Sequence, residues 1–288
     1  LDEQWKRGRE EGGRWVVPHK HVDAGWTDFR PANPLYPIYL WYATMADEDL
    51  ERVLRVPVSG LYRDIDVPVL SGTGASGKNT KHYNGNWYPW FEFIRGRRPD
   101  YPERILEANF RLIRHQLDKL RSEAGDPRNW KTDGFSTADI SSIHKWQEYC
   151  PVYFEGLLQL TLGAPAHLPH GGLQHARVRY FDAERRRPGL PQDVAALVAR
   201  VDASGVRVQL VNVSPVEARE VVLSAGMFGE HRFDEAIVLD ASGSAETARY
   251  AVGGKYVSVR LAAGSGVTLD LRMSRCVHRP SYDTPWAR

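Results

Sequence analysis

Apolar side chains in the first 165 residues recur at the three- and four-residue steps that are typical of amphipathic helices. Helices are predicted over 35–54, 86–94, 102–124 and 151–162, and the third has the clearest apolar stripe. Gly163 follows the last of these segments, where a glycine commonly ends a helix. The stripe of the third helix consists of Ile105, Ala108, Leu112, Ile113, Leu117 and Leu120.

The pattern changes to a period of two after residue 165. Val206, Val208 and Leu210 alternate with polar residues, as expected for a strand with one buried face. Similar short runs occur near 257–261 and 267–273, with glycine- and serine-rich turn signals between them. Six or seven such strands predict an antiparallel β-sandwich.

The predicted fold class is therefore α+β and multidomain, with an α-helical portion followed by an antiparallel β-sandwich. The boundaries fall at 1–165 for the helical domain and 166–288 for the sandwich, which ends in an extended tail. The distribution of tryptophan also differs between the two regions, because eight of the nine tryptophans precede residue 147.

Composition narrows the function classes. The 288 residues are 42% hydrophobic and 26% charged, and no apolar run reaches the length that a membrane helix needs. A net charge of +2 gives no general nucleic-acid footprint. Two cysteines exclude a disulfide framework and make a cysteine-based zinc site an unfavourable hypothesis. Neither a nucleic-acid nor a membrane partner is expected, and no compartment is indicated.

Three polar stretches rich in aromatic residues each precede a predicted helix. They cover 19–30, 81–87 and 143–150, and each supplies histidine, tryptophan or tyrosine beside an amide or carboxylate group. If the three helices pack in parallel, these stretches meet at one end. Such a surface suits a sugar, because sugar rings have apolar faces and hydroxyl edges.

Helices with polar-aromatic loops at their N-termini, followed by a β-sandwich, resemble the (α/α)-toroid carbohydrate-active enzymes. These are six-hairpin glycoside hydrolases and toroid polysaccharide lyases. The resemblance implies a site at the N-termini of the inner helices, with His21 and Asp23 as further candidates. The other residues implied are His82, Tyr83, Asn84, Trp87, His144, Trp146 and Glu148.

A complete toroid needs more helices than the four or five indicated here. Together with Leu1 as the first residue, this favours the expectation that the chain is the C-terminal part of a larger toroid. A smaller bundle is the alternative. An upstream portion of the same chain, or a second copy in a homo-oligomer, would then complete the helical domain.

The first hypothesis is a glycoside hydrolase that acts on an oligo- or polysaccharide through a carboxylate pair. Glu148 is the candidate general acid or base, and the sequence does not choose among Asp23, Asp28, Asp64 and Asp66 for the second carboxylate. The second is a polysaccharide lyase, in which Tyr83 with His82 or His144 removes the proton beside a uronate carboxylate. The third is a non-catalytic glycan-binding or structural subunit. In each, the candidate substrate-binding residues are Trp26, Asn84, Trp87, Trp146 and Tyr149.

Two further patterns carry less weight. His19, His21 and Asp23 alternate along an extended segment, but no fourth ligand is visible, so no metal is expected. The segment 72–78 approaches a phosphate-binding loop, but Asn79 stands where that loop has serine or threonine. We therefore expect no cofactor.

Overall fold

The computed structural model describes residues 1–32, 34–57, 87–134, 136, 138–142, 145–146, 149–165 and 175–287. The chain divides into two compact units. Unit 1 comprises Leu1–Phe91 and Lys131–Glu148, and unit 2 comprises Glu92–Trp130 and Tyr149–Arg288. Each unit is described by itself.

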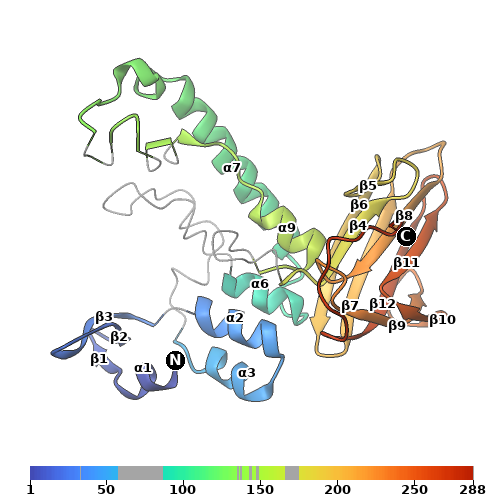
Figure 1. Ribbon diagram of the computed structural model, residues 1–288, viewed down its shortest axis with the longest axis horizontal. Coiled ribbons are helices and arrows are strands. Elements are labelled where there is room, and N and C mark those ends of the chain that lie inside the picture. The colour runs from blue at the N-terminus through green and yellow to red at the C-terminus, as the bar shows by residue number, and fades with distance from the viewer. Residues whose placement is uncertain are drawn as a thin grey trace. The chain divides into compact units, whose positions relative to one another are not determined.

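Unit 1 begins with a short helix and a three-stranded antiparallel sheet (Figure 1). Helix α1 (Asp2–Lys6) precedes β1 (Arg9–Glu11), β2 (Arg14–Val22) and β3 (Gly25–Pro31), and the strand order is β1-β2-β3. The turn between β1 and β2 consists of Gly12 and Gly13. Both have positive φ, at 57° and 74°, which two-residue hairpin turns favour.

A small apolar cluster holds this part of unit 1 together. Val17, Ala32 and Val56 are buried, and the rings of Trp5 and Trp15 pack against them. The centroids of the two rings are 5.2 Å apart. Trp5 thereby anchors α1, since no residue of that helix is itself buried.

Three more helices lie in the described part of the first 94 residues, and α2 and α6 meet through aromatic rings. They are α2 (Leu35–Thr44), α3 (Asp47–Leu54) and α6 (Trp87–Ile94), whose last three residues belong to unit 2. Met45 adopts the left-handed conformation and ends α2. The rings of Trp41 and Phe91 meet edge to face at 4.9 Å, and Tyr42 lies 5.3 Å from Trp90.

Unit 2 contains two further helices that pack through buried polar groups as well as apolar ones. They are α7 (Tyr101–Arg121) and α9 (Glu155–Leu162), with 3₁₀ turns at Glu123–Gly125 and Pro127–Asn129. The Tyr101 hydroxyl of α7 donates a hydrogen bond to the side-chain oxygen of Gln159 on α9. Gly156 allows close approach, because a Cβ atom there would lie 2.7 Å from the side chain of Ile105.

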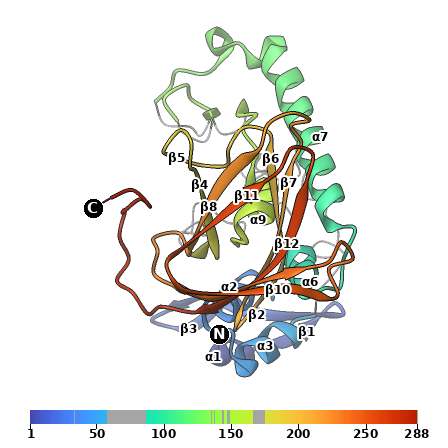
Figure 2. The same ribbon diagram turned by 90° about the vertical axis from the view of Figure 1, so that its right-hand side faces the viewer.

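Two antiparallel sheets form the larger part of unit 2 (Figure 2). The five-stranded sheet has the order β10-β9-β12-β7-β6, and the four-stranded sheet has the order β11-β8-β4-β5. Val208 pairs with Leu269 across β7 and β12, and both side chains are buried. The strands are β4 (Val178–Asp182), β5 (Arg187–Pro188), β6 (Val194–Asp202), β7 (Gly205–Asn212), β8 (Arg219–Ala225), β9 (Arg232–Leu239), β10 (Glu246–Gly254), β11 (Tyr256–Leu261) and β12 (Gly266–Ser274).

The C-terminal tail packs on the four-stranded sheet. Trp286 meets Phe181 of β4 edge to face at 5.8 Å, and the Tyr256 hydroxyl of β11 donates to the carbonyl of Asp283 at 3.2 Å. Upstream in the tail, Tyr282 contacts Phe228 with ring centroids 5.4 Å apart. These contacts extend the apolar core beyond the last strand.

The predicted fold class was wrong. The described residues form three antiparallel sheets and six α-helices, and these helices do not form a toroid. Residues 9–31 were assigned to a helical region, yet they form β1, β2 and β3. The predicted resemblance to (α/α)-toroid carbohydrate-active enzymes is therefore overturned. The sequence pattern did not predict β2 as a buried strand, because Val16, Val17 and Pro18 are buried in succession and lack the alternation that indicates a strand.

Candidate functional site

Half of the predicted site residues lie outside the described residues: His82, Tyr83, Asn84, His144 and Glu148. Their assignments remain predictions. For the same reason, the expected meeting of the stretches at 19–30, 81–87 and 143–150 is untested.

The other predicted residues have different surroundings. Asp23 is exposed in the two-residue turn between β2 and β3, and Trp26 on β3 contacts His21 with ring centroids 5.1 Å apart. Trp87 is buried at the start of α6. Trp146 is half exposed, and its indole N–H donates to the carbonyl of Ile140.

Tyr149, in unit 2, is also buried. Its ring stacks on Trp130 at 5.0 Å, and the ammonium group of Lys119 lies 4.6 Å from the ring centre. The candidates at 23, 26, 87 and 146 all belong to unit 1, so the described part of the predicted site is divided between two units. These five assignments also remain predictions.

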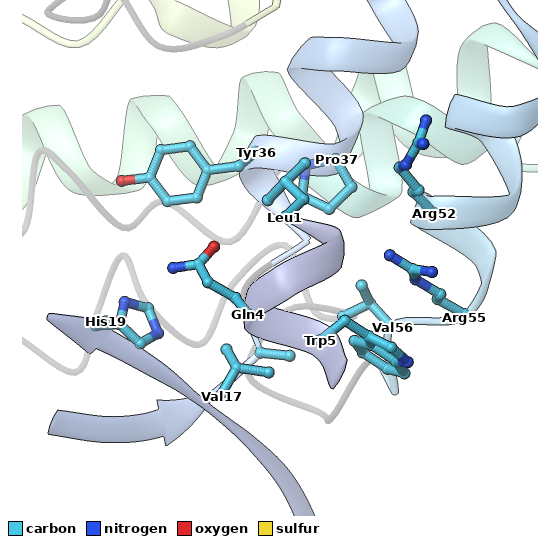
Figure 3. Close-up of a pocket in the computed structure, with 11 residues that line it drawn as sticks. Leu1, Gln4, Trp5, Val17, His19, Tyr36, Pro37, Arg52, Arg55 and Val56 are labelled. Carbon is cyan, nitrogen blue, oxygen red and sulfur yellow. The ribbon is translucent and has the colours of Figure 1, made fainter. Parts of the chain in front are cut away.

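A cavity of about 400 Å³ lies in unit 1. Figure 3 shows side chains from α1, β2, α2 and α3 around it, together with Val56 just after α3. A volume of this size is within the range of small-molecule sites. None of the predicted site residues lines it, although His19 belongs to the first polar-aromatic stretch.

One part of the wall is apolar and rigid. Val17, Ala32 and Val56 belong to the buried cluster and also line the cavity, and Trp5 and Pro37 extend this surface. The guanidinium group of Arg55 lies 4.9 Å from the centre of the Trp5 ring, which fixes the ring further.

Neutral hydrogen-bonding groups make up a second part of the wall. The side-chain amide of Gln4 donates to the carbonyl of Pro18 at 3.0 Å, so its oxygen remains oriented as an acceptor. Partial burial and the charge of Arg30 lower the pKa of His19, so its imidazole is neutral at pH 7. The Tyr36 ring is half exposed and contributes a hydroxyl group.

The third part of the wall carries positive charge, supplied by Arg52 and Arg55 near the end of α3. Arg52 donates through Nε to both carboxylate oxygens of Asp2, at 3.2 and 2.9 Å, and also contacts Asp49. Arg55 donates to Asp2 as well. These two arginines lower the pKa of Asp2, chiefly through their hydrogen bonds, so the carboxylate is ionised.

A second cavity, of about 410 Å³, lies in unit 2 and has a different wall. Its charged groups pair with one another: Arg219 contacts both Asp193 and Glu217, and the buried Asp182 lies near Arg185. It has little apolar surface against which a ligand could pack. No group of three or more potential metal ligands was found among the described residues.

Comparison with protein families adds one finding. Residues 2–158 match the model of a family described as a domain of unknown function, DUF8034. The chain belongs to the DUF8034 family. The matched region includes every residue that lines the cavity of unit 1 except Leu1.

Two other searches gave negative results. No curated protein matches the chain. None of the helices in the described part is both long and apolar enough to span a membrane.

Proposed function

We propose that this DUF8034 chain binds a saccharide in the cavity of unit 1. The observation that carries the proposal is the composition of the wall, in which a buried apolar cluster lies beside the neutral polar groups of Gln4, His19 and Tyr36. A sugar ring presents C–H groups on its faces and hydroxyl groups at its edge, so it can use both surfaces together.

The orientation of the polar groups supports binding of hydroxyl groups. A hydroxyl group both donates and accepts, and it needs partners of each kind when it leaves water. Gln4 offers an oriented acceptor, because one N–H of its amide donates to the carbonyl of Pro18 and fixes the group. The neutral imidazole of His19 offers one donor and one acceptor, and Tyr36 adds a hydroxyl group.

The proposal is for binding rather than for hydrolysis or elimination. The toroid resemblance that favoured those two hypotheses is overturned by the sheets of the structure, and the catalytic residues that they assign at 82, 83, 144 and 148 lie outside the described residues. A glycosidase also requires two carboxyl groups beside the bond that it breaks. The described wall of the cavity contains no aspartate or glutamate.

Calorimetric titration of the full chain with neutral and acidic mono- and disaccharides tests the proposal. Tyr36→Ala and His19→Ala should each weaken binding by about tenfold, because each removes a polar contact and part of the wall. Tyr250→Ala is the matched control, since Tyr250 is 60% exposed on β10 of unit 2 and Tyr36 is 53% exposed.

Three results would contradict the proposal. The first is the absence of binding for every saccharide at millimolar concentration. The second is equal weakening by the variants at Tyr36 and Tyr250. The third is hydrolysis of a bound disaccharide, because a wall without a carboxylate pair should not hydrolyse its glycosidic bond.

A further inference from the structure

The positive part of the cavity wall points to the charge of the ligand. Arg52 and Arg55 are three residues apart, so they lie on the same side of the C-terminal end of α3. Both arginines line the cavity, and Figure 3 shows them on the same side of it. Guanidinium groups recognise carboxylates with paired, charge-assisted hydrogen bonds.

A carboxylate of the chain itself, that of Asp2, already pairs with the two arginines. It contacts both arginines, and its side chain is 43% exposed. It belongs to α1, a helix of five residues with no buried side chain. Exchange of Asp2 for another carboxylate therefore costs little, because the released group returns to water and an exposed ion pair is weak.

Asp49 has a different role from Asp2. Its side chain is 8% exposed, it contacts Arg52, and it accepts a hydrogen bond from the Thr44 hydroxyl at 2.5 Å. Arg52 therefore keeps a buried partner when Asp2 leaves. For Arg55, Asp2 is the carboxylate that the described residues supply. Together, Asp2 and Asp49 balance the two arginines, and removal of the exposed carboxylate leaves one positive charge at the cavity.

We propose that the cavity is specific for an acidic saccharide of the uronate class, whose carboxylate replaces Asp2 at Arg55 and Arg52. This inference rests on the saccharide-binding function proposed above. The neutral groups of Gln4, His19 and Tyr36 then contact hydroxyl groups, and the discrimination between acidic and neutral sugars lies with the two arginines.

The test compares pairs of sugars that differ only at C6. D-Glucuronate is compared with D-glucose, and D-galacturonate with D-galactose, by titration into the full chain at low salt. The acidic member of a pair should bind about tenfold more tightly, because its carboxylate makes charge-assisted hydrogen bonds with the arginines that the neutral sugar cannot make. Added salt should reduce this preference.

Variants then assign the preference to the arginines. Asp2→Asn should tighten the binding of the acidic sugar several-fold and leave the neutral sugar unchanged, because it removes the competing carboxylate. Arg55→Gln should reduce the preference to near one. Asp47→Asn is the matched control, since it removes one negative charge from an exposed position on α3.

The outcomes separate the two proposals. Equal binding of acidic and neutral sugars would overturn the acidic specificity and leave saccharide binding in place. An equal effect of Asp2→Asn and Asp47→Asn would overturn the exchange at Asp2. Failure of all four sugars to bind would overturn both proposals. If Asp2→Asn loosens α1, the Arg55→Gln variant still tests whether the arginines cause the preference for the acidic sugar over the neutral sugar.

Discussion

The two units differ in the polar groups that line their cavities. In unit 2, Val198, Val208, Leu210 and Leu271 are at most 1% exposed, and the charged groups of the second cavity pair with one another. In unit 1, a cluster of three buried residues adjoins a cavity with oriented polar groups. Unit 1 is also packed, since Tyr42, Trp90 and Phe91 are at most 1% exposed, so the difference lies in the cavities: that of unit 1 retains hydrogen-bonding capacity for a ligand.

Two histidines show the same contrast. Burial lowers the pKa of His231 in unit 2 to about 4, and Arg177 and Arg275 add to this effect. Its Nδ1 accepts a hydrogen bond from the backbone N–H of Cys276, and its Nε2 lies 3.6 Å from Glu230. His19 in unit 1 also has a lowered pKa, but it faces a cavity. Protonation of either histidine therefore opposes folding, and protonation of His19 also changes the charge of the cavity wall.

The largest expected effect is the loss of stability in acid through His231. Below its ordinary pKa of 6.5, the unfolded chain takes up a proton that the folded chain does not take up until about pH 4. The free energy of unfolding should therefore fall across this window, by about 3 kcal/mol. Above pH 6.5 this contribution is fully present. Urea unfolding at pH 7 and at pH 4.5 measures the change.

The control for this prediction is His231→Asn, whose side-chain oxygen can accept the same N–H from Cys276 without titrating in this range. Carboxylates contribute equally to both proteins, so the difference between them isolates the histidine. His19→Asn should remove a smaller part of the same pH dependence, because the pKa of His19 is also lowered in the folded chain. Identical pH dependence in wild type and His231→Asn would show that the comparison of the two histidines is mistaken.

The regions of the fold that the sequence predicts correctly are those where one face of a strand is buried. Val206, Val208 and Leu210 alternate along β7, so their period of two is visible in the sequence. The hairpin of β2 and β3 has no such signal. Val16, Val17 and Pro18 are buried in succession, and the remainder of β2 is polar and exposed. The hairpin was therefore assigned to a helical region, and the prediction of a helical toroid depended in part on that wrong assignment.

The cavity could not be predicted because its chemistry is dispersed. Gln4, His19, Tyr36, Arg52 and Arg55 come from four separate elements, and no spacing in the sequence connects them. The sequence singles out His19 only as a member of a polar stretch and of an incomplete metal-ligand pattern. The Asp2 contact with Arg52 and Arg55 spans about 50 residues and depends on tertiary packing alone.

A smaller effect distinguishes the packing of the two units directly. Val208→Ala in β7 should cost about 2 kcal/mol, because Val208 is fully buried and its neighbours cannot close the space. Val17→Ala in β2 should cost about 1 kcal/mol, because Val17 already borders the cavity. Exchange of the amide hydrogens of β7 and β2 measures the two losses separately. A larger loss for Val17→Ala would reverse the proposed contrast between the units.

The smallest expected effect concerns the ion pairs. Arg207 and Asp270 in unit 2 form two parallel contacts of 2.7 Å, and the side chain of Asp270 is only 14% exposed. A double-mutant cycle with Arg207→Met and Asp270→Asn should give a coupling of about 1 kcal/mol. Arg207 lowers the pKa of Asp270, so this coupling is present at neutral pH and is lost as the pH falls below 4. Asp2→Asn, by contrast, should change the unfolding midpoint little and act mainly on ligand affinity, because the side chain of Asp2 is 43% exposed and ion pairs of exposed groups are weak. A clear loss of stability in Asp2→Asn would show that the Asp2 ion pairs of unit 1 are structural, as those of unit 2 are, and would remove the role of Asp2 as an exchangeable carboxylate.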